Sequence, residues 1–132
     1  MMASYTPQQM DLGKKLFFDP VLSKNQDLSC ASCHQLEKGL ADGLDRSISA
    51  KDENGKRGKL SRGTPSLWNI AFHKRFMWDG RANSLPEQAK LPLFSEIEMG
   101  NTPENLEASL NSIPAYLDLF QQAYGEKPSV DN

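Results

Sequence analysis

The feature that most constrains this chain is Cys30-Ala31-Ser32-Cys33-His34, which contains both of its cysteines. Thiols three residues apart lie on one turn of a helix, where they can reach the two vinyl groups of one haem edge. The imidazole that follows them can then ligate the iron. The motif therefore predicts one covalently attached haem c, with His34 as the metal ligand.

Other uses of a C-x-x-C pair remain open at this point. The two thiols could form a redox pair or half of a zinc site. A zinc site needs two more ligands, and His73 is the only other histidine in the chain. A structural disulfide would leave the adjacent histidine unexplained.

Composition narrows the class of protein. The 132 residues are enough for one domain, so residues 1–132 are expected to form a single haem domain. A formal net charge of −2 indicates neither a nucleic-acid partner nor an anionic membrane surface. No apolar run approaches the ~20 residues of a membrane span. Met1 to Tyr5 do not form a signal peptide. Because bacteria attach haem c outside the cytoplasm, we expect a periplasmic protein in a mature or trimmed form.

Helix signals dominate the remaining pattern. Thr6-Pro7 is typical of a helix start and Asp19-Pro20 of a helix end. A short helix is expected from about 29 to 36, and a long glycine-rich loop from 37 to 62. Further helices are expected at 84–90, from Thr102 and from Ser112. The last has the apolar stripe of an amphipathic helix, Ile113, Tyr116, Leu117, Phe120 and Tyr124. The expected fold is all-α, with long irregular loops around one haem.

Several short stretches occur together in one order and spacing, over nearly the whole chain. In that order and spacing the sequence resembles the N-terminal, peroxide-reducing haem domain of bacterial di-haem cytochrome c peroxidases and MauG-like proteins. The resemblance implies a class I cytochrome c-like haem domain. The family's second C-x-x-C-H domain is not among these residues, which is compatible with a truncated piece, a split half or a single-haem relative. The stretches are Leu12 to Pro20, Leu28 to His34, Ala41-Asp42-Gly43, Arg62 to Asn69, Met77 to Ala82, Glu87-Gln88-Ala89 and Glu98-Met99-Gly100.

The same resemblance assigns roles to particular residues. It implies that Glu98 moves a proton between the two peroxide oxygens and that Gln88 holds the peroxide by hydrogen bonds. Trp78 matches a tryptophan that relays electrons between two haems, although an ordinary core aromatic is an equal alternative. The resemblance assigns three further residues to the haem pocket: Pro65, Met77 and Met99.

Two classes of function follow. The first is an oxidoreductase that reduces hydrogen peroxide to water with electrons from a small donor protein, a cytochrome c or a cupredoxin. The second is a binding or carrier protein: an electron-transfer cytochrome c with His/Met ligation, through Met77 or Met99, or a haem-based ligand sensor. Many relatives block the iron with a histidine from the long loop, but the region around Gly55 has none. The resemblance therefore implies an open or loosely closed iron face.

Overall fold

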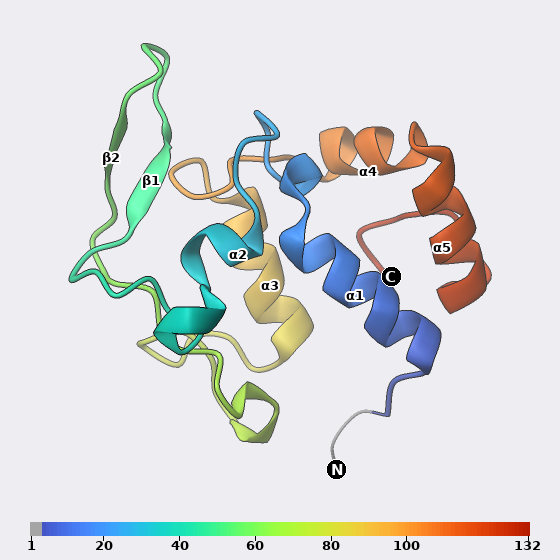
Figure 1. Ribbon diagram of the computed structural model, residues 1–132, viewed down its shortest axis with the longest axis horizontal. Coiled ribbons are helices and arrows are strands. Elements are labelled where there is room, and N and C mark those ends of the chain that lie inside the picture. Colours follow the sequence, from blue (N-terminus) through green and yellow to red (C-terminus); the bar gives the residue numbers. More distant parts are fainter. Residues whose placement is uncertain (1–3) are drawn as a thin grey trace.

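The structure is a computed structural model that describes residues 4–132, so Met1 to Ala3 lie outside the described residues. Helix α1, Pro7–Phe18, runs through the middle of the molecule (Figure 1). The Thr6 hydroxyl accepts from the Gln9 N–H at 3.2 Å, and the Gln9 side chain accepts from the Thr6 N–H at 3.0 Å. This reciprocal cap and the proline that follows Asp19 confirm both predicted ends of the helix.

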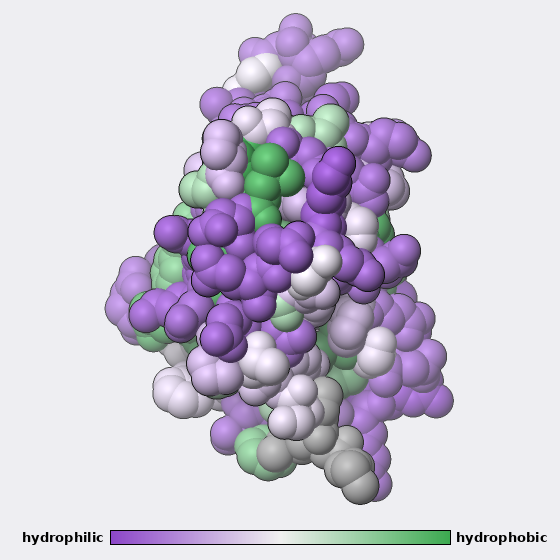
Figure 2. All heavy atoms as spheres, turned by 90° about the vertical axis from the view of Figure 1, so that its right-hand side faces the viewer, coloured by the Kyte–Doolittle hydropathy of each residue, from purple (hydrophilic) through white to green (hydrophobic). Residues whose placement is uncertain are grey.

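Three helices form the C-terminal half: α3, Leu85–Phe94; α4, Pro103–Asn111; and α5, Pro114–Tyr124. Thr102 caps α4 as predicted, by accepting from the Asn105 N–H at 3.1 Å. Ser112 ends α4 instead of starting α5, whose N-cap is Ile113. The face on which α4 and α5 lie is mostly hydrophilic (Figure 2), which leaves the apolar sides of these helices for the interior.

A hydrophobic cluster joins α1 to the C-terminal helices. Burial of an aromatic such as Phe120, 3% exposed, contributes about 1.5–3 kcal/mol. The Tyr116 hydroxyl donates to the Asp19 carboxylate and ties α5 to the end of α1. The buried members are Leu12, Val21, Leu22, Met99, Leu106, Leu110, Tyr116 and Phe120.

The prediction of an all-α, class I cytochrome c-like fold is wrong. Residues 4–132 form a mixed fold, five α-helices and a two-stranded antiparallel sheet, and only 43% of it is helical. Strands β1, Ile48–Lys51, and β2, Arg57–Lys59, form a hairpin within the predicted loop and extend away from the helices (Figure 1). The Asp52 carboxylate accepts from the Asn54 and Lys56 N–H groups, both at 2.9 Å, and closes the turn. The strands are only four and three residues long and have no buried residue, so their pattern is too short to predict a strand.

The haem motif forms less helix than predicted. Helix α2 comprises only Cys30–Cys33, and a 3-10 turn follows at Leu36–Lys38. Two further 3-10 turns lie at Pro20–Leu22 and Ile70–Phe72. Among the described residues, every helix is too short or too polar to traverse a bilayer.

Candidate functional site

Helix α2 places the two cysteines on a single turn. The Ser29 N–H donates to the Ser32 hydroxyl at 3.0 Å, which holds the first residues of the turn. Both cysteines are free thiols and half-buried, so the structural disulfide is not formed. Burial raises the pKa of the Cys30 thiol more than a backbone hydrogen bond lowers it.

The His34 ring is oriented by the loop that follows it. Its Nδ1 lies 2.8 Å from the backbone carbonyl oxygen of Leu40. A carbonyl oxygen only accepts, so Nδ1 carries the proton and Nε2 keeps a free lone pair. Gly39 and Leu40 both have positive φ, 66° and 60°, and this tight turn directs the carbonyl back to the ring. A histidine with one nitrogen held this way presents the other to a metal.

These residues fit a covalently held haem. Two free thiols lie on one helical turn, and the adjacent imidazole donates through Nδ1, so Nε2 is the nitrogen left for the iron. The zinc interpretation does not fit, because residues 4–132 contain no group of three or more His, Cys, Asp or Glu side chains that could hold a metal ion. His73, the other histidine, is exposed at the end of the Ile70–Phe72 turn.

A buried carboxylate lies behind the second cysteine. Asp42 is only 3% exposed and accepts from the Thr64 hydroxyl and the Leu44 N–H, both at 3.0 Å. Burial alone would raise the pKa of Asp42, but hydrogen bonds from Leu44, Ser47 and Thr64 outweigh it and lower the pKa. Burial raises the pKa of the Cys33 thiol most, and the charge of Asp42 raises it further.

Glu98 lies in the tight turn that follows α3. Its N–H donates to the Ser95 carbonyl at 3.0 Å, and the Gly100 N–H donates to the same oxygen at 2.9 Å. Gly100 has φ 65°, a conformation that glycine adopts without strain. The Glu98 side chain is half-buried and close enough to Cys33 for its charge to raise the thiol pKa, after the larger effects of burial and Asp42. The turn therefore brings a carboxylate to the cysteine helix.

Met99 belongs to the core of the molecule. It is 9% exposed within the hydrophobic cluster, and Cys30 packs against that cluster. Its N–H donates to the Pro92 carbonyl at 3.0 Å, and its carbonyl accepts from the Lys24 N–H at 2.9 Å. These contacts join the Glu98 turn to α3 on one side and to the segment before α2 on the other.

The remaining predicted site residues fall into one contact pair and two separate positions. The Gln88 Nε2 donates to the Met77 Sδ at 3.6 Å, and both side chains are half-buried. Trp78 is 64% exposed, so it is not a core aromatic, and its Nε1–H donates to the Gly63 carbonyl at 2.8 Å. Pro65 is half-buried directly after Thr64.

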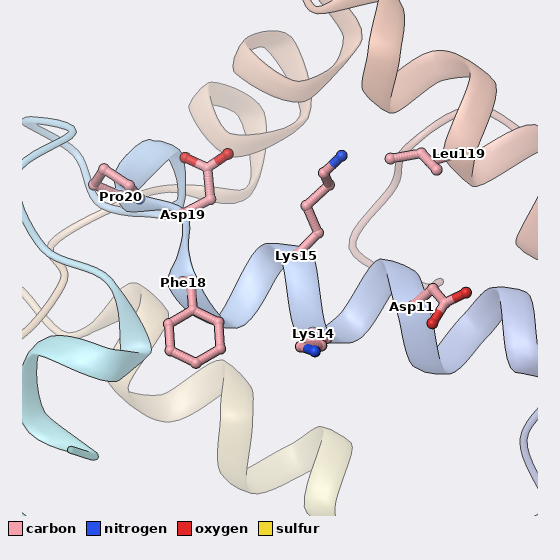
Figure 3. Close-up of a pocket in the computed structure, with 7 residues that line it drawn as sticks. All are labelled: Asp11, Lys14, Lys15, Phe18, Asp19, Pro20 and Leu119. Carbon is pink, nitrogen blue, oxygen red and sulfur yellow. The ribbon is translucent and has the colours of Figure 1, made fainter. Parts of the chain in front are cut away.

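A surface hollow lies elsewhere, between α1 and α5 (Figure 3). Its lining combines apolar and charged side chains, and it includes none of the predicted site residues. Figure 3 labels that lining: Asp11, Lys14, Lys15, Phe18, Asp19, Pro20 and Leu119.

Four residues that contribute to the site around the cysteines have no role in the sequence analysis. Leu40 acts through its backbone carbonyl, so its side chain gives no sign in the sequence that it orients His34. Asp42 and Thr64 lie in stretches that carry the family resemblance, but the sequence does not predict the hydrogen bond between them. The hairpin residue Ala50 donates its N–H to the Ile97 carbonyl at 2.9 Å, a link that only the tertiary structure creates.

Comparison with known proteins identifies what this arrangement is similar to. The profile described as di-haem cytochrome c peroxidase matches residues 7–132. The cytochrome c551 peroxidase of Pseudomonas aeruginosa is 43% identical over 95% of this chain and 36% of its own length. The methylamine utilization protein MauG of Methylorubrum extorquens is 38% identical over 95% of this chain and 34% of its own length. The chain thus spans about a third of these relatives.

Solved structures agree with the sequence matches. A MauG-like protein associated with microbial copper homeostasis superimposes with a TM-score of 0.83 and 29% identity, covering 97% of this chain and 38% of that one. A diheme peroxidase from Burkholderia thailandensis superimposes with a TM-score of 0.79 and 28% identity, covering 96% of this chain and 34% of that one.

Proposed function

Because the chain belongs to the di-haem cytochrome c peroxidase family, we propose that residues 1–132 form one haem c domain that reduces hydrogen peroxide. The haem is held by thioether bonds to Cys30 and Cys33, with the Nε2 of His34 on the iron. The observation that carries this proposal is the 2.8 Å hydrogen bond from His34 Nδ1 to the Leu40 carbonyl, beside two free thiols. When bound, the haem supplies the iron that takes up peroxide and passes electrons to it.

Glu98 and Gln88 supply the proton chemistry. The reaction consumes two electrons and two protons, and it converts hydrogen peroxide to two waters. The Glu98 carboxylate accepts the proton of one peroxide oxygen and delivers it to the oxygen that leaves as water. The Gln88 amide orients the peroxide by hydrogen bonds. The half-buried position of Glu98, with its charge acting on Cys33, supports this role.

Electrons reach the domain from a small donor protein, a cytochrome c or a cupredoxin, or from a second haem domain. Trp78 is the proposed relay, because its indole is largely exposed while its Nε1–H is held by Gly63. Pro65, Met77 and Met99 complete the walls of the haem pocket. Since haem c is attached outside the bacterial cytoplasm, the periplasm is the proposed location.

The electron carrier is the weaker candidate. A carrier fills the second axial position of the iron, usually with methionine. Met99 is buried in the hydrophobic cluster, and the Met77 sulfur accepts the Gln88 amide. Neither thioether is presented as a free ligand.

Expression with a haem c maturation system in the periplasm, followed by two measurements, tests the proposal. Mass spectrometry after acid–acetone extraction should find one haem retained per chain. Peroxide consumption with a reduced cytochrome c or cupredoxin should be detectable but slow, because this chain has one C-x-x-C-H motif and the reaction takes two electrons. A haem-loaded protein with no peroxide consumption above that of free haem would refute the function.

A further inference from the structure

The hairpin formed by β1 and β2 is bonded to the turn that carries Glu98. The Ala50 N–H in β1 donates to the Ile97 carbonyl at 2.9 Å, immediately before Glu98. On the other side of Glu98, the carbonyl of Met99 accepts from the Lys24 N–H at 2.9 Å. The backbone is therefore held on both sides of Glu98, and one of the two bonds comes from the hairpin.

One ion pair anchors the hairpin to the rest of the molecule. The Arg57 guanidinium donates to the Asp27 carboxylate at 2.8 Å and, through its other nitrogen, to the Ser49 carbonyl at 3.0 Å. Asp27 lies in the segment that leads into Cys30, and its own N–H donates to the Ser23 hydroxyl at 3.0 Å. Ser23 is 2% exposed, so the backbone of Asp27 is bonded to a buried side chain.

This ion pair is better placed than a typical surface pair. The side chains of Arg57 and Asp27 are each only 24% exposed. Arg57 also makes a second, charge-assisted bond to the backbone of the opposite strand, which braces the hairpin across its two strands. Lys51, whose side chain is 46% exposed, approaches the same carboxylate at 3.6 Å and adds little.

A two-stranded hairpin of this kind depends on such an anchor. An isolated hairpin is at best marginally stable in water. No residue of either strand is fully buried, so apolar burial contributes little to their stability. Without Arg57 the hairpin keeps only the longer and more exposed contact of Lys51 with Asp27, and the Ala50 to Ile97 bond loses most of this support.

We propose that Arg57 and Asp27 are positioning residues for Glu98. Their ion pair fastens the hairpin to the segment that carries the cysteines, and the hairpin in turn holds the Glu98 turn through Ala50 and Ile97. The catalytic part of this inference rests on the proposed function, in which Glu98 moves the proton. The mechanical part concerns only the coupling between Arg57 and the turn Ser95–Gly100.

Hydrogen exchange followed by mass spectrometry on the haem-loaded protein tests the mechanical part. Arg57→Ala should speed exchange at least fivefold in peptides covering β1, β2 and the Glu98 turn. Helix α5 should exchange as before. Arg62→Ala is the matched control, because it breaks the exposed pair with Asp79, whose two atoms lie 3.2 Å apart. Unchanged exchange in the Glu98 turn of Arg57→Ala would overturn the inference.

Peroxide kinetics and a double-mutant cycle test the catalytic part. Arg57→Ala should lower kcat about tenfold with full haem content and an unchanged KM for the electron donor. The double variant Asp27→Ala with Arg57→Ala should closely match Arg57→Ala in both kcat and exchange, because either single change already breaks the same ion pair. Losses that add up in the double variant would contradict the ion-pair role. If the wild-type protein consumed no peroxide, the proposed function would fail, while the exchange result would still decide the coupling.

Discussion

The Nε2 of Gln88 lies 3.6 Å from the Sδ of Met77, a residue 11 positions earlier in the chain. A thioether sulfur can only accept, so the contact directs the amide nitrogen to Met77 and the carbonyl oxygen the other way. Met77 adopts φ 69°, which is uncommon for a residue with a side chain. The proposed peroxide-binding amide is thus oriented by a residue in a strained backbone conformation.

Replacing Met77 by leucine should free the Gln88 amide while nearly conserving volume. Stability should change by less than about 1.5 kcal/mol, since Leu and Met are close in size. The kcat/KM for peroxide should fall several-fold, because the amide then rotates. Met10→Leu, at a 58% exposed position on α1, is the control and should match the wild type. Equal kinetics for the two variants would show that Met77 does not orient the Gln88 amide for peroxide binding.

Removing both thiols should release the haem. In Cys30→Ala with Cys33→Ala, acid–acetone should extract all haem, because no thioether bond remains. Each single variant should retain haem through one bond. Absorption spectra and intact mass together measure the outcome. Retention of haem by the double variant would place the attachment elsewhere.

Replacement of Glu98 should separate ligand binding from peroxide cleavage. Cyanide should bind the as-isolated ferric protein quickly, since no loop histidine is available near Gly55 to block the iron. Glu98→Ala should leave cyanide binding largely intact and lower peroxide turnover roughly 10²- to 10⁴-fold, the usual contribution of general acid–base catalysis. Glu96→Ala, at an exposed position in the same turn, is the control. Slow cyanide binding that requires prior reduction would favour a carrier with Met77, Met99 or His73 on iron.

The buried carboxylate of Asp42 should make stability depend on pH. Its hydrogen bonds lower its pKa in the folded state below the unfolded value of about 4. The stabilisation is therefore present above about pH 4 and is lost as the pH falls through the folded pKa. Asp42→Asn should cost about 1.5–3 kcal/mol at pH 7, with a smaller difference from the wild type below pH 4.

Urea unfolding of the haem-loaded protein across this pH range measures the Asp42 effect. Asp45→Asn is the matched control, because Asp45 is exposed and three residues away. Its stability should follow that of the wild type at every pH. An Asp42→Asn penalty that stayed constant down to pH 3 would contradict the role of its ionised form.

Local hydrogen bonds made parts of this protein predictable. The ends of α1 depend on Thr6, Gln9 and the Asp19-Pro20 pair, which interact within a few residues of one another. The start of α4 depends on Thr102 and Pro103 in the same way. The haem motif is also local, because two thiols and an imidazole within five residues carry its chemistry. In each case the physical cause lies within one helical turn of sequence.

Short elements that depend on distant partners were not predictable. Strands β1 and β2 are four and three residues long, and they are stabilised by Arg57 and Asp27, which are 30 residues apart. The boundary between α4 and α5 moved by one residue because Ser112 makes its hydrogen bond to the end of α4 and not to the start of α5. The sequence indicated a break between the two helices near Ser112. Whether the Ser112 hydroxyl bonds to α4 or to α5 depended on how the two helices pack.

By itself, the sequence determined the C-x-x-C-H motif, the caps that start α1 and α4, and the family of the chain. Only the tertiary structure decided which groups meet around that motif. The Leu40 carbonyl orients His34, Thr64 binds Asp42 behind Cys33, and Ala50 holds the turn of Glu98. Two of these three contacts use backbone atoms, which every residue has, so the identity of a residue carries no signal for them. They exist because segments far apart in the chain meet in the folded protein.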